Sequence, residues 1–156
     1  MFIYFPDFDF DNWWPAIVGD WGDLPPFSGD SWKHVLVGDD DGDGGGHLLE
    51  VAAIRRVEGK TAFPGGWGPE QIGEAAAVVL RAAASSLNVE SAARLAPGSS
   101  YREIVRVGGA RLLVQVTLEY GVDGGAVLTV FPIRGDGVQR VESGRMKDRP
   151  LFKDEV

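Results

Sequence analysis

Three segments in the second half of the chain alternate between apolar and polar residues with the two-residue period of a β-strand. They read YREIVRV over residues 101–107, ARLLVQVTLEY over 110–120 and AVLTVFPI over 126–133. In the middle segment Val114, Val116 and Leu118 alternate with polar side chains, which is the pattern of a sheet with one buried and one wet face. Because short glycine-rich turns join the segments, we predict an antiparallel meander of three strands.

Two segments in the first half of the chain repeat apolar residues with the period of an α-helix. Residues 48–57 predict a short helix with Leu49, Ala53 and Ile54 on its buried face. Residues 69–87 predict the longest helix, and they open with Pro-Glu, which suits the first turn and the positive end of the helix dipole. Helices followed by a meander predict an α+β fold, with N-terminal helices packed on a C-terminal antiparallel β-sheet.

The first part of the chain is rich in aromatic side chains. Residues 1–33 hold ten of the sixteen aromatics, interleaved with aspartates and prolines. This composition is too aromatic for a disordered tail, so we expect the segment to wrap around the domain and bury its rings. The alternative is an acidic, aromatic docking surface for a partner. Residues 34–133 then form the body of the domain.

The last part of the chain carries charges of both signs and few apolar groups. For residues 134–156 we expect a charged, solvated extension or an extra edge strand rather than a functional arm. Lys147, Arg149 and Lys153 are the side chains of this segment that could reach a bound phosphate.

Length and composition bound the class of protein. A chain of 156 residues forms one domain with a sizeable core. It has no cysteine, which excludes disulfides, thiol catalysis and cysteine-ligated metals. No apolar run approaches the length of about eighteen residues that a membrane span needs, and the N-terminal sequence lacks the pattern of a secretory signal.

The net charge of −8 argues against tight binding to nucleic acid, because phosphates are contacted by lysine and arginine. The acidity is concentrated in residues 1–50, which carry eleven acidic residues and one lysine. Residues 51–133 and residues 134–156 each carry a net charge of +1. This distribution leaves room for weak, salt-sensitive binding of a nucleic acid, whereas tight nonspecific binding is not expected.

The only two histidines, His34 and His47, stand on either side of a loop rich in glycine and aspartate. Each one alone is most simply a surface residue or a satisfied core residue. Together they form a candidate acid–base pair, because imidazole titrates near neutrality and the loop is flexible enough to bring both rings to one pocket. Such a pair needs neither a metal nor a cofactor.

Motifs around this loop resemble those of the bacterial EndoU nuclease family. In order along the chain they are HVLVGD, GGGH, GKTAFPGGWGPEQI and VLTVFPI. Order and approximate spacing agree from residue 33 to 72, and the resemblance as a whole covers residues 32–133, about two thirds of the chain. It implies a sheet of the barnase–EndoU–colicin–RelE type, with the active site on its concave face.

The resemblance also implies roles for individual residues. His34 and His47 match the two family histidines that act as general acid and general base; we favour His34 as the acid, although the sequence does not decide the order. Thr129 matches a threonine of the closing strand and would hold the phosphate. Phe131, on the same strand face as Thr129, stands where the family usually has tyrosine, so it would contact substrate without a hydroxyl.

A further basic residue of the family has no single counterpart in this chain. Arg106 is our candidate for the catalytic cation, and Arg102 and Lys60 are candidates for binding the substrate. A cation at this place would stabilise the charge that develops on the phosphate.

The function implied by the resemblance is that of a metal-independent endoribonuclease toxin. Attack by a ribose 2′-hydroxyl would leave a 2′,3′-cyclic phosphate and a 5′-hydroxyl. The implied partners are RNA, with transfer RNA as one candidate, and a cognate immunity protein; DNA and membranes are not expected. The implied location is that of a secreted or delivered effector acting in the cytoplasm of a target cell.

Two other functions compete with this one. A noncatalytic binding module on the same fold is favoured by the missing tyrosine, the missing basic residue and the net charge. A single calcium loop is the other, because Asp39, Asp41, Asp43, Gly44 and Glu50 match the spacing of an EF-hand. A glycine directly before this loop and another at its eighth position favour a plain acidic turn over calcium binding.

Overall fold

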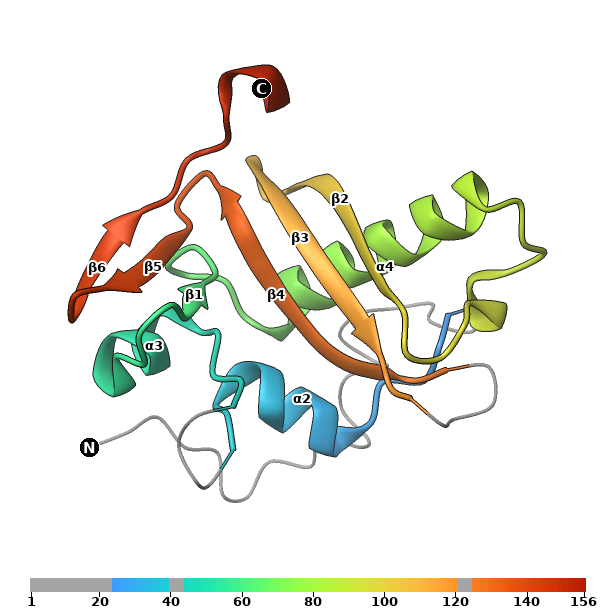
Figure 1. Ribbon diagram of the computed structural model, residues 1–156, viewed down its shortest axis with the longest axis horizontal. Helices are drawn as coiled ribbons and strands as arrows, with labels where there is room; N and C mark the ends of the chain where they lie inside the picture. The colour runs from blue at the N-terminus through green and yellow to red at the C-terminus, as the bar shows by residue number, and fades with distance from the viewer. Residues whose placement is uncertain (1–23, 40–43, 121–124) are drawn as a thin grey trace.

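A three-stranded antiparallel sheet backed by one long helix forms the main body of the fold (Figure 1). The computed structural model describes residues 24–39, 44–120 and 125–156. The strands, in their order across the sheet, and the helix are β2 (Ser100–Val107), β3 (Ala110–Leu118), β4 (Val127–Gly135) and α4 (Pro69–Ser86). The α+β class and the meander are confirmed, with every strand end within two residues of its expected position.

The hydrophobic core lies between this sheet and α4. Each strand contributes alternate side chains to it, and in the centre of β3 these are Val114, Val116 and Leu118, as predicted. From α4 the core receives Ile72, Val79 and other apolar residues of one helix face. The remaining side chains of the strands, between the core residues, point to the opposite face of the sheet. That face is therefore available for a functional site.

Two β-bulges in β4 decide which of its side chains reach that opposite face. Thr129 pairs with Thr117 and Phe131 pairs with Gln115, so the expected common face of Thr129 and Phe131 is confirmed. The first register shift leaves Leu128 without a partner in β3, and its side chain is exposed. A second shift follows one residue before Arg134. A bulge adds one residue to one strand and thereby changes the alternation on either side of it.

A second, smaller sheet lies beside the end of β4. It contains β1 (Thr61–Ala62), β5 (Gln139–Glu142) and β6 (Arg145–Asp148), in that order and all antiparallel. Residues 134–156, expected to be an extension or an edge strand, thus complete β4, form a hairpin that pairs with β1, and end in a turn. Within this hairpin β5 lies at the centre of the small sheet and β6 at its edge, and the boundary expected at residue 134 falls inside β4.

The helix α2 (Gly29–Leu36) was not expected from the sequence, because it begins inside the aromatic segment. The Ser28 side chain caps it by accepting a hydrogen bond from the Ser31 backbone N–H at 3.2 Å. Phe27 and Trp32 are fully buried and stack with their ring centroids 4.0 Å apart. Burial is confirmed for these two rings, and the other eight aromatics of the segment lie outside the described residues.

The short helix α3 (Leu49–Arg55) forms where it was predicted but turns a different face to the core. Leu48, Val51 and Ala52 are buried, whereas Ile54 is 50% exposed. The expected buried face was therefore wrong by about one residue position around the helix. No helix within the described parts of the chain is both long enough and apolar enough to cross a membrane.

Candidate active site

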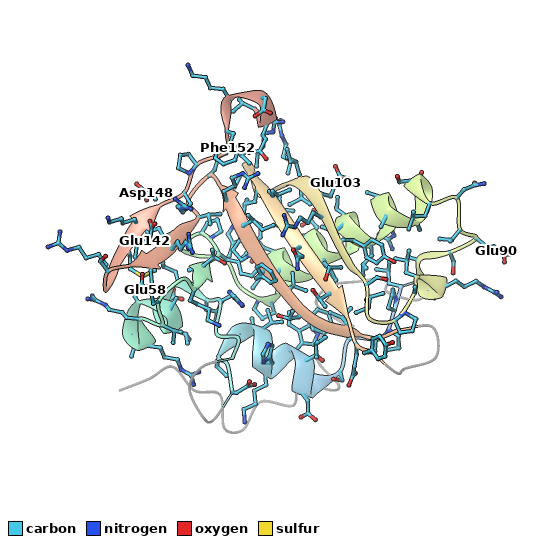
Figure 2. The ribbon with its side chains drawn as sticks, viewed as in Figure 1. Glu58, Glu90, Glu103, Glu142, Asp148 and Phe152 are labelled. Carbon is cyan, nitrogen blue, oxygen red and sulfur yellow. The ribbon has the colours of Figure 1, made fainter. Side chains whose placement is uncertain are left out.

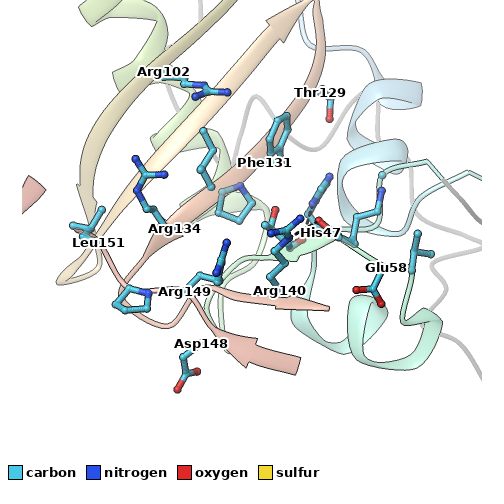
Figure 3. Close-up of a pocket in the computed structure, with 18 of the residues that line it drawn as sticks. His47, Glu58, Arg102, Thr129, Phe131, Arg134, Arg140, Asp148, Arg149 and Leu151 are labelled. Carbon is cyan, nitrogen blue, oxygen red and sulfur yellow. Dashed lines mark hydrogen bonds between the residues drawn. The ribbon is translucent and has the colours of Figure 1, made fainter. Parts of the chain in front are cut away.

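A pocket of about 810 Å³ opens on the sheet face opposite α4, where β4, the β5–β6 hairpin and the segment before β1 meet (Figure 3). Six of the seven residues predicted for the site line this one pocket. They are His34, His47, Lys60, Arg102, Thr129 and Phe131. The site thus draws together residues that lie as much as 97 positions apart in the sequence, from 34 to 131.

The described end of the glycine-rich loop, residues 44–47, folds back onto the end of α2 and so brings the two histidines to the same pocket. The backbone N–H of Gly46 donates to the carbonyl of His34, and that of His47 donates to the carbonyl of Val35, both at 2.8 Å. These bonds satisfy carbonyls that a helix end leaves unpaired. Gly45 has a φ of +66°, and a Cβ there would collide with the His34 carbonyl oxygen, so this turn requires glycine.

His47 is buried and has its tautomer fixed by a backbone acceptor. Its Nδ1 lies 2.7 Å from the carbonyl oxygen of Thr61; a carbonyl only accepts, so Nδ1 carries the hydrogen and Nε2 has a free lone pair. Its ring stacks on Phe131 with centroids 5.5 Å apart. Burial lowers the pKa of His47 from 6.5 to about 4. The hydrogen bond to Thr61 opposes this shift, and the nearby Lys60 and His34 add to it. At neutral pH the ring is therefore an uncharged proton acceptor.

His34 is more exposed and has a carboxylate partner instead. Its Nδ1 lies 2.8 Å from Oδ1 of Asp39, the residue that follows α2 by three positions. Because the carboxylate accepts this hydrogen bond, it holds the ring with Nδ1–H toward Asp39 and leaves Nε2 for another partner. The two imidazoles therefore differ in burial and in the group behind them, which is an arrangement suited to different roles.

Cationic side chains from remote segments surround the histidines. The pocket is lined by Lys60, Arg102, Arg134, Arg140 and Arg149, against two carboxylates, Glu58 and Asp148. Figure 3 shows Arg140 beside His47, with Arg149 next to it and the Asp148 carboxylate directed away from the pocket. The local charge is thus positive in a protein whose net charge is −8.

Arg134 and Arg140 were missed by sequence reasoning, and Arg149 was noted only as a side chain within reach of a phosphate. Arg140 and Arg149 come from the hairpin and the chain after it, a segment whose fold the sequence did not reveal. Arg134 follows a bulge, which simple strand alternation does not anticipate. The cluster of basic residues after position 133 was the one signal available.

Arg106 does not line the pocket, so its expected place in the site is corrected. It lies on the same strand as Arg102 but opposite Arg111, beside the turn between β2 and β3. Four residues along a strand correspond to about 13 Å, which is beyond the length of an arginine side chain. Arg102, opposite Gln115 and hydrogen bonded to it at 2.7 Å, is the arginine of β2 that reaches the site.

The competing calcium loop is described only in part. Asp41 and Asp43 lie outside the described residues, and the carboxylate of Asp39 is hydrogen bonded to His34. Within the described residues, no group of three or more His, Cys, Asp or Glu side chains could hold a metal ion.

No protein-family model, curated protein or solved structure matches this chain. The resemblance to EndoU nucleases therefore rests on the motifs HVLVGD, GGGH, GKTAFPGGWGPEQI and VLTVFPI.

Proposed function

We propose that this protein is a metal-independent endoribonuclease whose catalytic groups are His34 and His47. The observation that carries the proposal is that two imidazoles line one positively charged pocket. Each has its Nδ1 hydrogen bonded to an acceptor, so its Nε2 is the nitrogen that can exchange a proton with a substrate. Such a pair can take a proton from one oxygen and give a proton to another without a metal.

In the proposed reaction His47 is the base and His34 the acid. Nε2 of neutral His47 takes the proton of a ribose 2′-hydroxyl, and the 2′-oxygen forms a bond to the adjacent phosphorus. The bond from phosphorus to the 5′-oxygen breaks, and Nε2–H of protonated His34 gives its proton to that oxygen. The products are a 2′,3′-cyclic phosphate and a 5′-hydroxyl, and the two histidines exchange protonation states until solvent restores them.

The negative charge that grows on the phosphate oxygens is stabilised by the cations around the histidines. Arg140, held by a 3.3 Å hydrogen bond from its Nε to the Gly59 carbonyl, is the arginine drawn beside His47, and Lys60 contributes charge from the adjoining segment. Thr129 offers a hydroxyl on the same strand face as Phe131. Donors fixed in advance around a developing charge are usually among the largest contributions to catalysis.

The proposal includes RNA as the substrate class, with transfer RNA as one candidate, and it excludes DNA, which has no 2′-hydroxyl. On the resemblance alone it also includes a toxin role: a delivered effector that acts in the cytoplasm of a target cell and is held in check by an immunity protein.

A noncatalytic RNA-binding module is the second candidate. Its favouring observation is the pKa of about 4 for His47, which makes this ring a weak base. A binding module would use the same cations and the stacked Phe131 ring without needing proton transfer.

Cleavage of total RNA in EDTA, by the wild type and by His34→Asn and His47→Asn, separates these candidates. Asparagine keeps a donor near the Nδ1 position, facing Asp39 or Thr61, but does not transfer protons. We expect wild-type cleavage in EDTA and a loss of about 10²–10⁴-fold in each variant, with thermal midpoints near that of the wild type. An intact protein that binds RNA without cleaving it would establish the binding module instead.

A further inference from the structure

The last residues of the described chain fold over one side of the pocket and pair with an arginine of its wall. Arg134, near the end of β4, donates to both carboxylate oxygens of Glu155 in the final turn η2 (Lys153–Glu155), at 2.7 and 2.6 Å. Both side chains are partly buried, with 22% and 15% of their surface exposed. The guanidinium also lies 3.9 Å from the centroid of the Phe152 ring.

Arg134 belongs to the pocket and not to a separate surface. The second bulge of β4 pairs Arg134 with Leu113, and the side chain lines the same cavity as His47. Leu151 and Phe152, from the segment that carries Glu155, line that side of the cavity too; Figure 2 shows Phe152 beside the end of β4. Arg134 stands three residues along β4 from Phe131, which stacks on His47, so it lies about 10 Å along the strand from the proposed reaction centre.

A guanidinium that binds a carboxylate through two parallel hydrogen bonds presents the geometry that also binds a phosphate. In the free protein the carboxylate of Glu155 takes that place. If the Glu155 carboxylate moved away, Arg134 would be free to bind another anion beside Arg149 and Phe152. Its distance from the histidines suits a phosphate other than the one being cleaved.

We propose that Arg134 is a subsite for an RNA backbone phosphate beyond the scissile one. Glu155 occupies this subsite in the free protein, and residues 151–156 form a strap that a longer RNA displaces. The inference rests on the proposed function in its choice of RNA as the ligand.

The test measures the binding of a short 2′-O-methyl oligonucleotide, which cannot be cleaved by attack of a 2′-hydroxyl, and of a 2′-O-methyl dinucleotide, which is too short to reach both places. The variants are Glu155→Gln, Arg134→Gln and their combination. Glu155→Gln removes the charge but keeps an acceptor for the Phe152 N–H, which is 2.7 Å from Oε1. Asp154→Asn is the matched control, because it removes the same charge one residue away from the ion pair.

For the oligonucleotide we expect Glu155→Gln to lower the Kd by about three- to tenfold and to steepen its dependence on salt by about 0.7 in log Kd against log salt, the increment for one more phosphate contact. Asp154→Asn should have a clearly smaller effect, and the double variant should bind no more tightly than Arg134→Gln. Binding of the dinucleotide should not respond to Glu155→Gln.

Oligonucleotide binding that is unchanged by Glu155→Gln, or tightened equally by Asp154→Asn, would overturn the subsite and leave a purely structural ion pair. This outcome is independent of the nuclease proposal, since unmodified RNA can still be cleaved. Conversely, tighter binding by Glu155→Gln in a protein that cleaves no RNA would support the phosphate subsite while the nuclease proposal failed.

Discussion

At the scale of single residues, the candidate site depends on what stands behind each imidazole. A backbone carbonyl faces Nδ1 of His47 and a carboxylate faces Nδ1 of His34. The His47 ring is buried and uncharged at neutral pH, and the His34 ring is partly exposed and next to a negative charge. Neither partner could be named from the sequence, because Thr61 contributes only its backbone and Asp39 is one of several adjacent aspartates.

The burial of His47 predicts a loss of stability in mild acid. The unfolded ring takes a proton as the pH falls through 6.5, whereas the folded ring stays neutral until about pH 4. The unfolded state therefore binds more protons in this window, and the free energy of unfolding should decrease by up to about 3 kcal/mol as the pH falls from 6.5 to 4. Urea unfolding at several pH values checks this, with His47→Asn as the comparison. A variant with the same pH dependence as the wild type would show that His47 is not the group responsible.

Phe131 provides a prediction about the missing hydroxyl. Its ring stacks on His47 and lines the pocket, so a hydroxyl at the ring edge has room to reach the cavity. Phe131→Tyr should keep the fold and increase the rate of RNA cleavage, because the added group can contribute about 0.5–1.5 kcal/mol when it finds a partner. A fall in stability of more than about 1 kcal/mol would mean that the hydroxyl is buried without one.

At the scale of elements, the strands and α4 were predictable because their periods are regular and one face of each is buried. The features that complete the site were not. Bulges in β4 change the alternation around Thr129 and Phe131, α2 is concealed by aromatic composition, and the β5–β6 hairpin has few apolar residues. The histidines and Lys60 stand in the quoted motifs, and Arg102 was a candidate only by its approximate position, while Arg134 and Arg140 depend on the hairpin and the bulge.

The turn that joins the two histidines can be tested through its glycines. Gly45→Ala forces a collision with the His34 carbonyl oxygen in addition to the strain of a positive φ. Gly66 also has a positive φ, +84°, but has nothing within 4 Å of an added Cβ. We expect Gly66→Ala to lower the free energy of unfolding by about 1–2 kcal/mol and Gly45→Ala to lower it further and to reduce cleavage. Equal effects of the two changes would show that the contact with His34 does not matter.

At the scale of the whole molecule, charge is divided between an acidic first third and a pocket lined by cations. Residues 1–50 carry eleven acidic residues and one lysine, whereas the pocket is lined by five cations and two carboxylates. This division reduces the conflict between a net charge of −8 and the proposed polyanionic substrate. It would also confine the proposed RNA binding to one face, and we therefore expect that binding to be weak and salt-sensitive.

Neutralising part of the acidic segment should therefore strengthen RNA binding. Asp7, Asp9 and Asp11 lie outside the described residues, but their charge acts over roughly the Debye length, about 10 Å at 0.1 M salt. Changing all three to asparagine should lower the Kd for RNA at low salt, with a difference that shrinks as salt is added. An affinity that stays the same across the whole salt titration would place this segment away from the path of the substrate.

If His34 and His47 cleave RNA through its own 2′-hydroxyl, as we propose, the chain should cut a nucleic acid only where that hydroxyl is present. The most direct test is mass spectrometry of the products from a DNA oligonucleotide that contains a single ribonucleotide, incubated with the protein in EDTA. We expect one cut, directly after the ribonucleotide, giving one fragment with a 2′,3′-cyclic phosphate and one with a 5′-hydroxyl, and no such products with His47→Asn. A 5′-phosphate on the second fragment, or equal cleavage by His47→Asn, would contradict it.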